Sequence, residues 1–133
     1  MLRLEIVTPE KRILDAEVDS VTVPTATGEA GILPNHASLI SALKPGILSY
    51  TNKGTTEKLA VSGGFVEVSN NKVAVLTDSA ETASEIDIEV AKSDRDAAEK
   101  SLAAVAMAAV EETEIVRERL DAANVRLQLA SGK

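Results

Sequence analysis

The chain has 133 residues, and its 21 acidic against 14 basic side chains give a formal net charge of −7. This charge repels nucleic-acid backbones and anionic lipids, and one Phe and one Tyr cannot build aromatic platforms for bases, so nucleic-acid binding is not expected. The absence of cysteine excludes disulfides, thiolate metal sites and cysteine nucleophiles.

Residues 1–84 are expected to form a β domain. Leu2, Leu4 and Ile6 alternate with other residues at the period of a strand. Turn signals follow at residues 8–11, 26–29, 51–54, 63–64 and 70–71. Short strands are predicted between them, at residues 2–7, 18–23, 47–51, 57–61, 65–68 and 72–77. Short alternating strands with recurring turn signals are typical of an all-β sandwich or barrel.

A bent apolar segment, GILPNHASLISALKPG at residues 31–46, holds the only histidine, His36. Two prolines fix φ within it, and its glycines permit tight bends. Its large apolar residues exceed what one strand face can bury: Ile32, Leu33, Leu39, Ile40 and Leu43. Part of this surface is therefore expected to face a partner. His36 either contacts that partner or faces backbone and water, since no second metal ligand or nucleophile lies nearby.

Residues 85–133 are expected to be helical, because they hold no proline and are rich in alanine. Ser84 or Asp87 is the expected N-cap. Apolar residues recur at helical spacing in two runs: Ile88, Ala91, Ala98, Leu102 and Val105, and then Val116, Leu120, Ala123, Leu127 and Ala130.

The sequence does not decide whether this part forms one helix or two. A continuous helix from Asp87 to Leu129 would be about 65 Å long, and local propensity favours it. Hydrophobic burial favours an antiparallel pair with a bend at residues 106–112. The two arrangements could be close in free energy, which is what a two-state element requires.

An enzyme is not expected from this inventory of residues. The sequence has no HExxH, CxxC, EF-hand, GxGxxG or P-loop pattern. It also has no stretch near the roughly 20 apolar residues that span a bilayer, and no signal-peptide pattern at the N-terminus.

Four ordered motifs together resemble the epsilon subunit of rotary F-type ATP synthases, called delta in mitochondria. They are TGEAGILPNHASLISALKPG, AVSGGFVEV, KVAVLTDSAE and SEIDIEVAK, and the resemblance runs from residue 4 to about residue 102. It implies a sandwich of about ten strands at residues 1–84 and an antiparallel α-helical hairpin at residues 85–133. It also implies a non-catalytic central-stalk rotor subunit without a cofactor, which links the gamma subunit to the c-ring and couples proton flow to ATP synthesis.

The resemblance also assigns contact residues. Gly28, Glu29 and Ala30 match the turn that touches the c-ring, and His36 and Ser41 match the stretch that faces gamma. The implied location is peripheral, on the cytoplasmic face of the bacterial inner membrane, or alternatively on an organellar coupling membrane.

The helical part carries two further assignments. Some members of the family bind ATP at residues that match Glu81, Ile86, Asp87 and Ala91, but Val90 stands where their motif has Arg, so ATP binding is expected to be weak or absent. The resemblance also implies transient contact with the beta or alpha subunits: in the family, basic residues on the second helix meet the beta subunit when the helices extend and inhibit ATP hydrolysis. Arg117, Arg119 and Arg126 match that role, or simply form a solvated face. An ATP-sensing switch and an unrelated adaptor remain the alternative functions.

Overall fold

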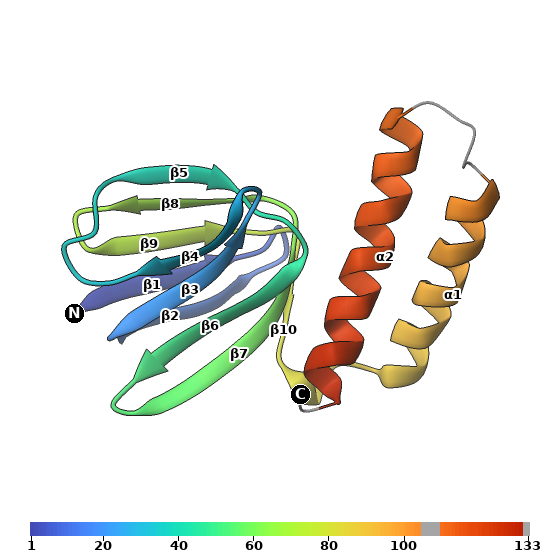
Figure 1. Cartoon of the computed structure of the whole chain (residues 1–133). Helices are drawn as coiled ribbons and strands as arrows, with labels where there is room; N and C mark the ends of the chain where they lie inside the picture. Colours follow the sequence, from blue (N-terminus) through green and yellow to red (C-terminus); the bar gives the residue numbers. More distant parts are fainter. Residues whose placement is uncertain (105–109, 132–133) are drawn as a thin grey trace.

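The alternating apolar residues of the N-terminal part build a β-sandwich of two five-stranded sheets, seen in the computed structural model of Figure 1. The structure describes residues 1–104 and 110–131. The first sheet has the order β2 (Arg12–Val18), β1 (Leu2–Val7), β9 (Lys72–Leu76), β8 (Phe65–Ser69) and β5 (Leu39–Ala42). The second has the order β10 (Ser79–Glu81), β7 (Thr55–Ser62), β6 (Gly46–Asn52), β3 (Ser20–Thr25) and β4 (Gly28–Ile32). The predicted sandwich is thereby confirmed.

The pairing is antiparallel in both sheets except where β1 runs parallel to β9. An isolated bridge between Thr25 and Leu43 joins the two sheets at the edge formed by β4 and β5. The predicted bent segment therefore consists of the end of β4, a turn, the edge strand β5 and this bridge. Its two halves belong to different sheets.

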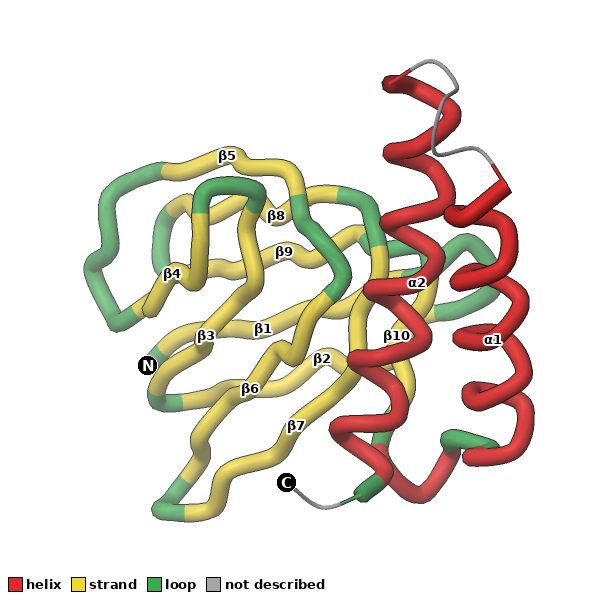
Figure 2. The backbone as a smooth tube through the Cα atoms, turned by 45° about the vertical axis from the view of Figure 1, so that its right-hand side comes forward, coloured by secondary structure: helices red, strands yellow, loops and turns green. Residues whose placement is uncertain are grey.

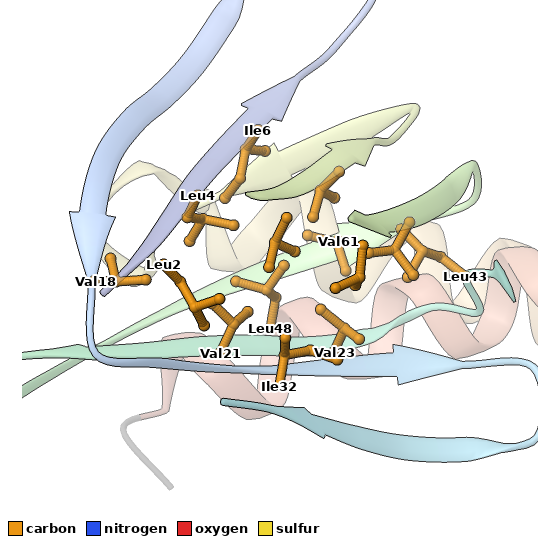
Figure 3. Packing of buried hydrophobic residues seen from close by; sticks show 14 of the residues in the cluster. Leu2, Leu4, Ile6, Val18, Val21, Val23, Ile32, Leu43, Leu48 and Val61 are labelled. Atoms are coloured by element: carbon orange, nitrogen blue, oxygen red, sulfur yellow. The ribbon is translucent and has the colours of Figure 1, made fainter. Parts of the chain in front are cut away.

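The main core lies between the inner faces of the sheets, where branched aliphatic side chains interdigitate (Figure 3). Leu2, Leu4 and Ile6 are fully buried, as their alternation predicts. Strand β7 differs, because Leu59, Ala60 and Val61 are buried in succession. Leu59 and Val61 belong to the main core, whereas Ala60 belongs to a second cluster under the helices. Both faces of β7 are thus covered.

The predicted turns at residues 51–54 and 70–71 join β6 to β7 and β8 to β9. Lys53, Gly54, Asn70 and Asn71 all have positive φ, which suits glycine and asparagine in tight hairpins. The strands β4, β5 and β10 lie outside the strands predicted from the sequence alone, and so does β2 apart from its last residue, Val18. Strand β4 was predicted partly as a turn, and β10 has only three residues, too few for a period to be recognised.

Two packed α-helices follow the sandwich, so the chain does not form the continuous rod. A short 3₁₀ helix (Ala83–Glu85) precedes α1 (Ile88–Ala104) and α2 (Val110–Ala130), which run antiparallel (Figure 1). Asp87 is the N-cap of α1, because its Oδ1 accepts hydrogen bonds from the backbone N–H groups of Glu89 and Val90 at 3.0 and 3.2 Å. Ser84 lies inside the 3₁₀ helix instead. Most of the predicted bend at residues 106–112 lies outside the described residues.

Helix α2 lies between the sandwich and α1 (Figure 2). It packs on the outer faces of β6 and β7, where Leu129 joins Ala60 in the second cluster. Ala91, Ala98 and Ala123 are buried as their spacing predicts. Ile88 was expected on the same buried stripe but is exposed, because it occupies the first turn of α1, ahead of the position where Ala91 meets the cluster.

Glu85 caps the 3₁₀ helix and makes a testable contribution to stability. Its Oε1 accepts hydrogen bonds from the backbone N–H and the hydroxyl of Thr82, at 3.0 and 2.9 Å, and these lower the pKa of the carboxyl group. Because the pKa is lower in the folded state, the carboxylate stabilises the fold at pH values above its unfolded-state pKa. This stabilisation is lost as the pH falls through the folded-state pKa.

Glu85→Gln should therefore melt about 2 °C below the wild type near neutral pH. The gap in melting temperature should narrow as the pH falls below about 4.5, the ordinary pKa of the carboxyl group, and should vanish below its lowered pKa in the folded protein. Melting curves of both proteins across this range check the prediction, and a gap that is independent of pH would contradict it.

Candidate interaction surfaces

The loop between β4 and β5 crosses the edge of the sandwich and is held in place by its own hydrogen bonds (Figure 2). Asn35 has positive φ, and its backbone N–H donates to Oδ1 of Asn71 at 2.6 Å, which ties the loop to the β8–β9 turn. The backbone N–H of His36 donates to the carbonyl of Leu33 at 3.2 Å. The loop is therefore held in a defined shape by contacts within the chain itself.

The two predicted gamma-contact residues lie at this edge. His36 is half-buried, with its Nδ1 2.6 Å from the carbonyl oxygen of Ala37. Ser41 lies in β5 and is also half-buried, and its hydroxyl donates to the carbonyl of Ala42 at 3.2 Å. In the alternation of β5, Leu39 and Ser41 turn toward the sandwich while Ile40 and Ala42 turn outward. Ile40 is thus more accessible to a partner than Ser41.

An apolar patch covers the outer face of the first sheet beside this loop. We call Ile40, Ala42, Phe65 and Leu76 the β5–β8–β9 patch. The exposed fractions of Ile40, Phe65 and Leu76 are 72%, 45% and 42%. The register places Phe65 opposite both Ala42 and Leu76, so the last three members are cross-strand neighbours. A single apolar side chain on a surface is ordinary, but a contiguous group of this kind is typical of an interface.

A pocket of about 310 Å³ adjoins the patch. It is lined by Val7, Thr8, Pro9, Gly64, Phe65, Leu76, Thr77 and Asp78. Ile40 was predicted from the sequence as surplus apolar surface, whereas Phe65 and Leu76 were not. The alternation of the two strands could have revealed them, because Val66 and Val75 face the core and their neighbours at 65 and 76 must then face outward.

The predicted c-ring contact lies at the start of β4, next to the turn that follows β3. Glu29 is exposed there. Gly28 adopts a φ of 128°, and its carbonyl accepts a hydrogen bond from the hydroxyl of Thr25. Ala30 is half-buried and packs against the main core. Of the three predicted residues, Glu29 presents the most accessible group, while Ala30 supports the strand from inside.

The predicted nucleotide-binding residues already make contacts within the chain. Ile86 and Ala91 are buried in the second cluster, and Asp87 caps α1. Glu81 pairs with Arg126, with 2.8 Å between Oε1 and Nε. Val90, which stands in the place of the motif arginine, is exposed.

The three arginines of α2 divide into two kinds. Arg117 and Arg119 are exposed, consistent with a solvated face or a contact with a partner. Arg126 is not on a solvated face, because its side chain is only 21% exposed and lies between Glu81 of β10 and Asp94 of α1. The sequence missed this pairing because the three residues come from separate elements.

A second pocket, of about 220 Å³, opens between β2, β6 and β7. Tyr50, Lys11 and Lys58 are among its lining residues. Burial raises the pKa of the Tyr50 hydroxyl, and the nearby carboxylate of Glu57 raises it further. Among residues 1–104 and 110–131, no three His, Asp or Glu side chains gather where they could hold a metal ion. In the same part of the chain, no helix has the length and apolar character needed to cross a bilayer.

Comparison with known proteins identifies the family. Residues 1–83 match the family described as ATP synthase, Delta/Epsilon chain, beta-sandwich domain. The ATP synthase epsilon chain of Desulforamulus reducens is 52% identical over 100 residues, covering 75% of this chain and 76% of the relative. That of Carboxydothermus hydrogenoformans is 51% identical over 102 residues, covering 77% and 76%.

Solved structures agree with this family. A chain of the Euglena gracilis mitochondrial ATP synthase, solved as OSCP/F1/c-ring, is 25% identical with a TM-score of 0.78, covering 93% of this chain and 78% of its own length. A chain from the Tetrahymena thermophila central stalk/c-ring structure shares the fold, at 14% identity and a TM-score of 0.61, with 98% and 94% covered. The chain therefore belongs to the family of ATP synthase delta and epsilon chains, which makes it a non-catalytic subunit of ATP synthase.

Proposed function

We propose that this chain is the rotor subunit that joins the gamma subunit to the c-ring in the central stalk, and so couples proton flow to ATP synthesis. The observation that carries the proposal is the β5–β8–β9 patch beside the hydrogen-bonded loop of His36. Membership of the family supplies the partners, and the patch supplies a surface that needs one.

Gamma docks on the β5–β8–β9 patch and the adjoining loop, with His36 and Ser41 at its border. Three large side chains of the patch, Ile40, Phe65 and Leu76, are the anchors. The loop is already held by Asn71, so docking loses little conformational entropy. A joint that transmits torque requires such a preformed surface.

The c-ring contacts the start of β4 through Glu29, with Gly28 shaping the backbone and Ala30 supporting it. An exposed carboxylate suits a polar loop better than an apolar surface. These contacts hold the chain peripherally at the membrane, on the cytoplasmic side in a bacterium.

The helical hairpin regulates ATP hydrolysis. In the folded arrangement α2 lies on β6 and β7, on the outer face of the sheet that does not carry the patch. Gamma can therefore dock while the hairpin is folded. When the helices extend, the exposed Arg117 and Arg119 reach the beta subunit, Arg126 is released to join them, and hydrolysis is inhibited.

ATP is not needed to hold the hairpin folded in this chain. The acid Glu81 already has a cation in Arg126, Asp87 caps α1, and Val90 brings no charge for a phosphate. Calorimetry with millimolar ATP should give no measurable heat of binding. Saturable binding would instead favour the alternative function, a nucleotide-sensing switch.

The direct test of the proposed function is mixing the full chain with its cognate gamma subunit and following complex formation by size-exclusion chromatography. A stoichiometric complex supports the proposal, and separate elution of the two proteins contradicts it. The unrelated-adaptor alternative predicts the second result.

A further inference from the structure

One guanidinium group ties together the three parts of the folded arrangement. Arg126 belongs to α2, Glu81 to β10 of the sandwich, and Asp94 to α1. The Nε of Arg126 is 2.8 Å from Oε1 of Glu81, and one terminal nitrogen donates to Oε2 of the same carboxylate at 3.4 Å. The other terminal nitrogen donates to Oδ2 of Asp94 at 3.2 Å. Arg126 thus bridges residues that are 45 and 32 positions away in the chain.

The pair with Glu81 is partly shielded from water. The side chains of Arg126 and Glu81 are only 21% and 28% exposed, whereas Asp94 is 52% exposed. The buried Nε–H of Arg126 is not aligned with any hydrogen-bond acceptor, so its short contact with Glu81 is chiefly electrostatic. Removing the partner of a partly buried charge costs more free energy than removing the partner of an exposed charge.

The apolar contacts that hold α2 on the sandwich are modest. The second cluster has four buried members, Ala60, Ile86, Ala91 and Leu129, of which two are alanines, and the residues packed against it, Ile47, Val125, Leu127 and Ala130, are only partly buried. Beside α2 runs a pocket of about 310 Å³, lined by residues that include Ala60, Ala122, Glu81 and Arg126. The helix–sheet contact is therefore incompletely filled, and the ion pairs supply a larger share of its stability than they would in a dense core.

We infer that Arg126, Glu81 and Asp94 form an ion-pair latch that sets the balance between the folded and the extended hairpin. Separating α2 from the sandwich breaks the pair with Glu81, and separating α1 from α2 breaks the pair with Asp94. Both motions must occur for the hairpin to extend, and both are opposed by the same side chain. This inference deepens the proposed function, and its regulatory part rests on the hairpin being inhibitory when extended.

Arg126 can pair either with the two latch acids or with the beta subunit, but not with both at once. Its charge is neutralised by Glu81 and Asp94 while the hairpin is folded, and it is released only on extension. Substituting an acid of the latch should therefore favour extension and leave the arginine free for the beta subunit. Substituting Arg126 should favour extension but remove one of the groups that the extended form uses.

The latch itself can be tested on the full chain alone. The natural sequence has no cysteine, so Thr55→Cys on β7 and Glu118→Cys on α2 take spin labels at two exposed positions without competing sites. The wild type should give one main distance, that of the folded hairpin, and a minor longer one, that of the extended hairpin. In Arg126→Gln, Glu81→Gln and Asp94→Asn the population at the longer distance should rise, about three- to tenfold in Arg126→Gln and least in Asp94→Asn.

Asp96→Asn is the matched control, because Asp96 lies on α1 and pairs only with its neighbour Arg95 among the described contacts. It should keep the wild-type distance. The Asp94→Asn change lies at a half-exposed side chain, so it tests the latch without threatening the fold. The latch is contradicted if none of the three variants differs from Asp96→Asn.

A second measurement tests the regulatory part in reconstituted ATP synthase. Glu81→Gln and Asp94→Asn should lower the rate of ATP hydrolysis about two- to threefold below that with the wild type, and Arg126→Gln should lower it less. If the distances change as expected but all hydrolysis rates stay equal, the latch stands and the inhibitory role of the hairpin fails. Equal rates with unchanged distances would overturn the latch instead.

Discussion

Ile40→Lys should weaken the affinity for gamma about thirtyfold or more, the scale of a hot-spot residue. Ile40 is the most exposed member of the β5–β8–β9 patch, and a lysine there would place a charge where the partner requires an apolar surface. The change should not harm the isolated chain. Ile40 lies opposite Glu67 in the register of β5 and β8, so lysine gains a favourable cross-strand neighbour.

The matched control is Thr55→Lys, which adds the same charge at an exposed position of β7 in the other sheet. Calorimetric titration of gamma into each variant gives the two affinities, and thermal melting confirms that both variants are folded. If Ile40→Lys binds gamma as tightly as Thr55→Lys does, the patch is not the docking surface.

Gly64→Ala should lower the melting temperature by about 10 °C or more, corresponding to about 3 kcal/mol in the free energy of unfolding. Gly64 has a φ of +87°, which side chains rarely adopt, and an added Cβ would clash with the backbone carbonyl of Leu76. The strand end that carries Leu76 would have to move. Because Gly64 precedes Phe65, the variant should also distort the β5–β8–β9 patch.

Gly31→Ala provides the comparison, because an added Cβ there meets no atom within 4 Å and the backbone φ is not positive. It should melt close to the wild type. Thermal unfolding of the two variants side by side separates strain at one glycine from the general effect of adding a methyl group. A Gly64→Ala protein that melts within about 2 °C of Gly31→Ala would refute the assignment of strain.

Sequence periodicity predicted the β-sandwich part of the fold because its signals are local. Leu2, Leu4 and Ile6 report one buried face of a strand, and the Asn70–Asn71 pair reports a turn with positive φ. The parallel pairing of β1 with β9 could not be read in this way, since it joins residues about 70 positions apart, such as Arg3 and Lys72. Long-range register is set by the packing of the whole core.

The candidate site was predicted in position better than in detail. The apolar excess of the bent segment indicated a partner surface, and Ile40 is indeed exposed there. Phe65 and Leu76 complete the patch only because β8 and β9 lie beside β5, which requires the strand order of the sheet. Arg126 looked like a surface residue for the same reason, because no local pattern shows that Glu81 and Asp94 approach it.

Hydrogen–deuterium exchange of the full chain, with and without the cognate gamma subunit, tests most directly whether the patch beside the His36 loop is the docking surface. We predict slower exchange on binding in residues 33–42 and in the peptides that contain Phe65 and Leu76, with little change in β7. Protection confined to β7 and the hairpin, with exchange in residues 33–42 unaltered, would contradict the account.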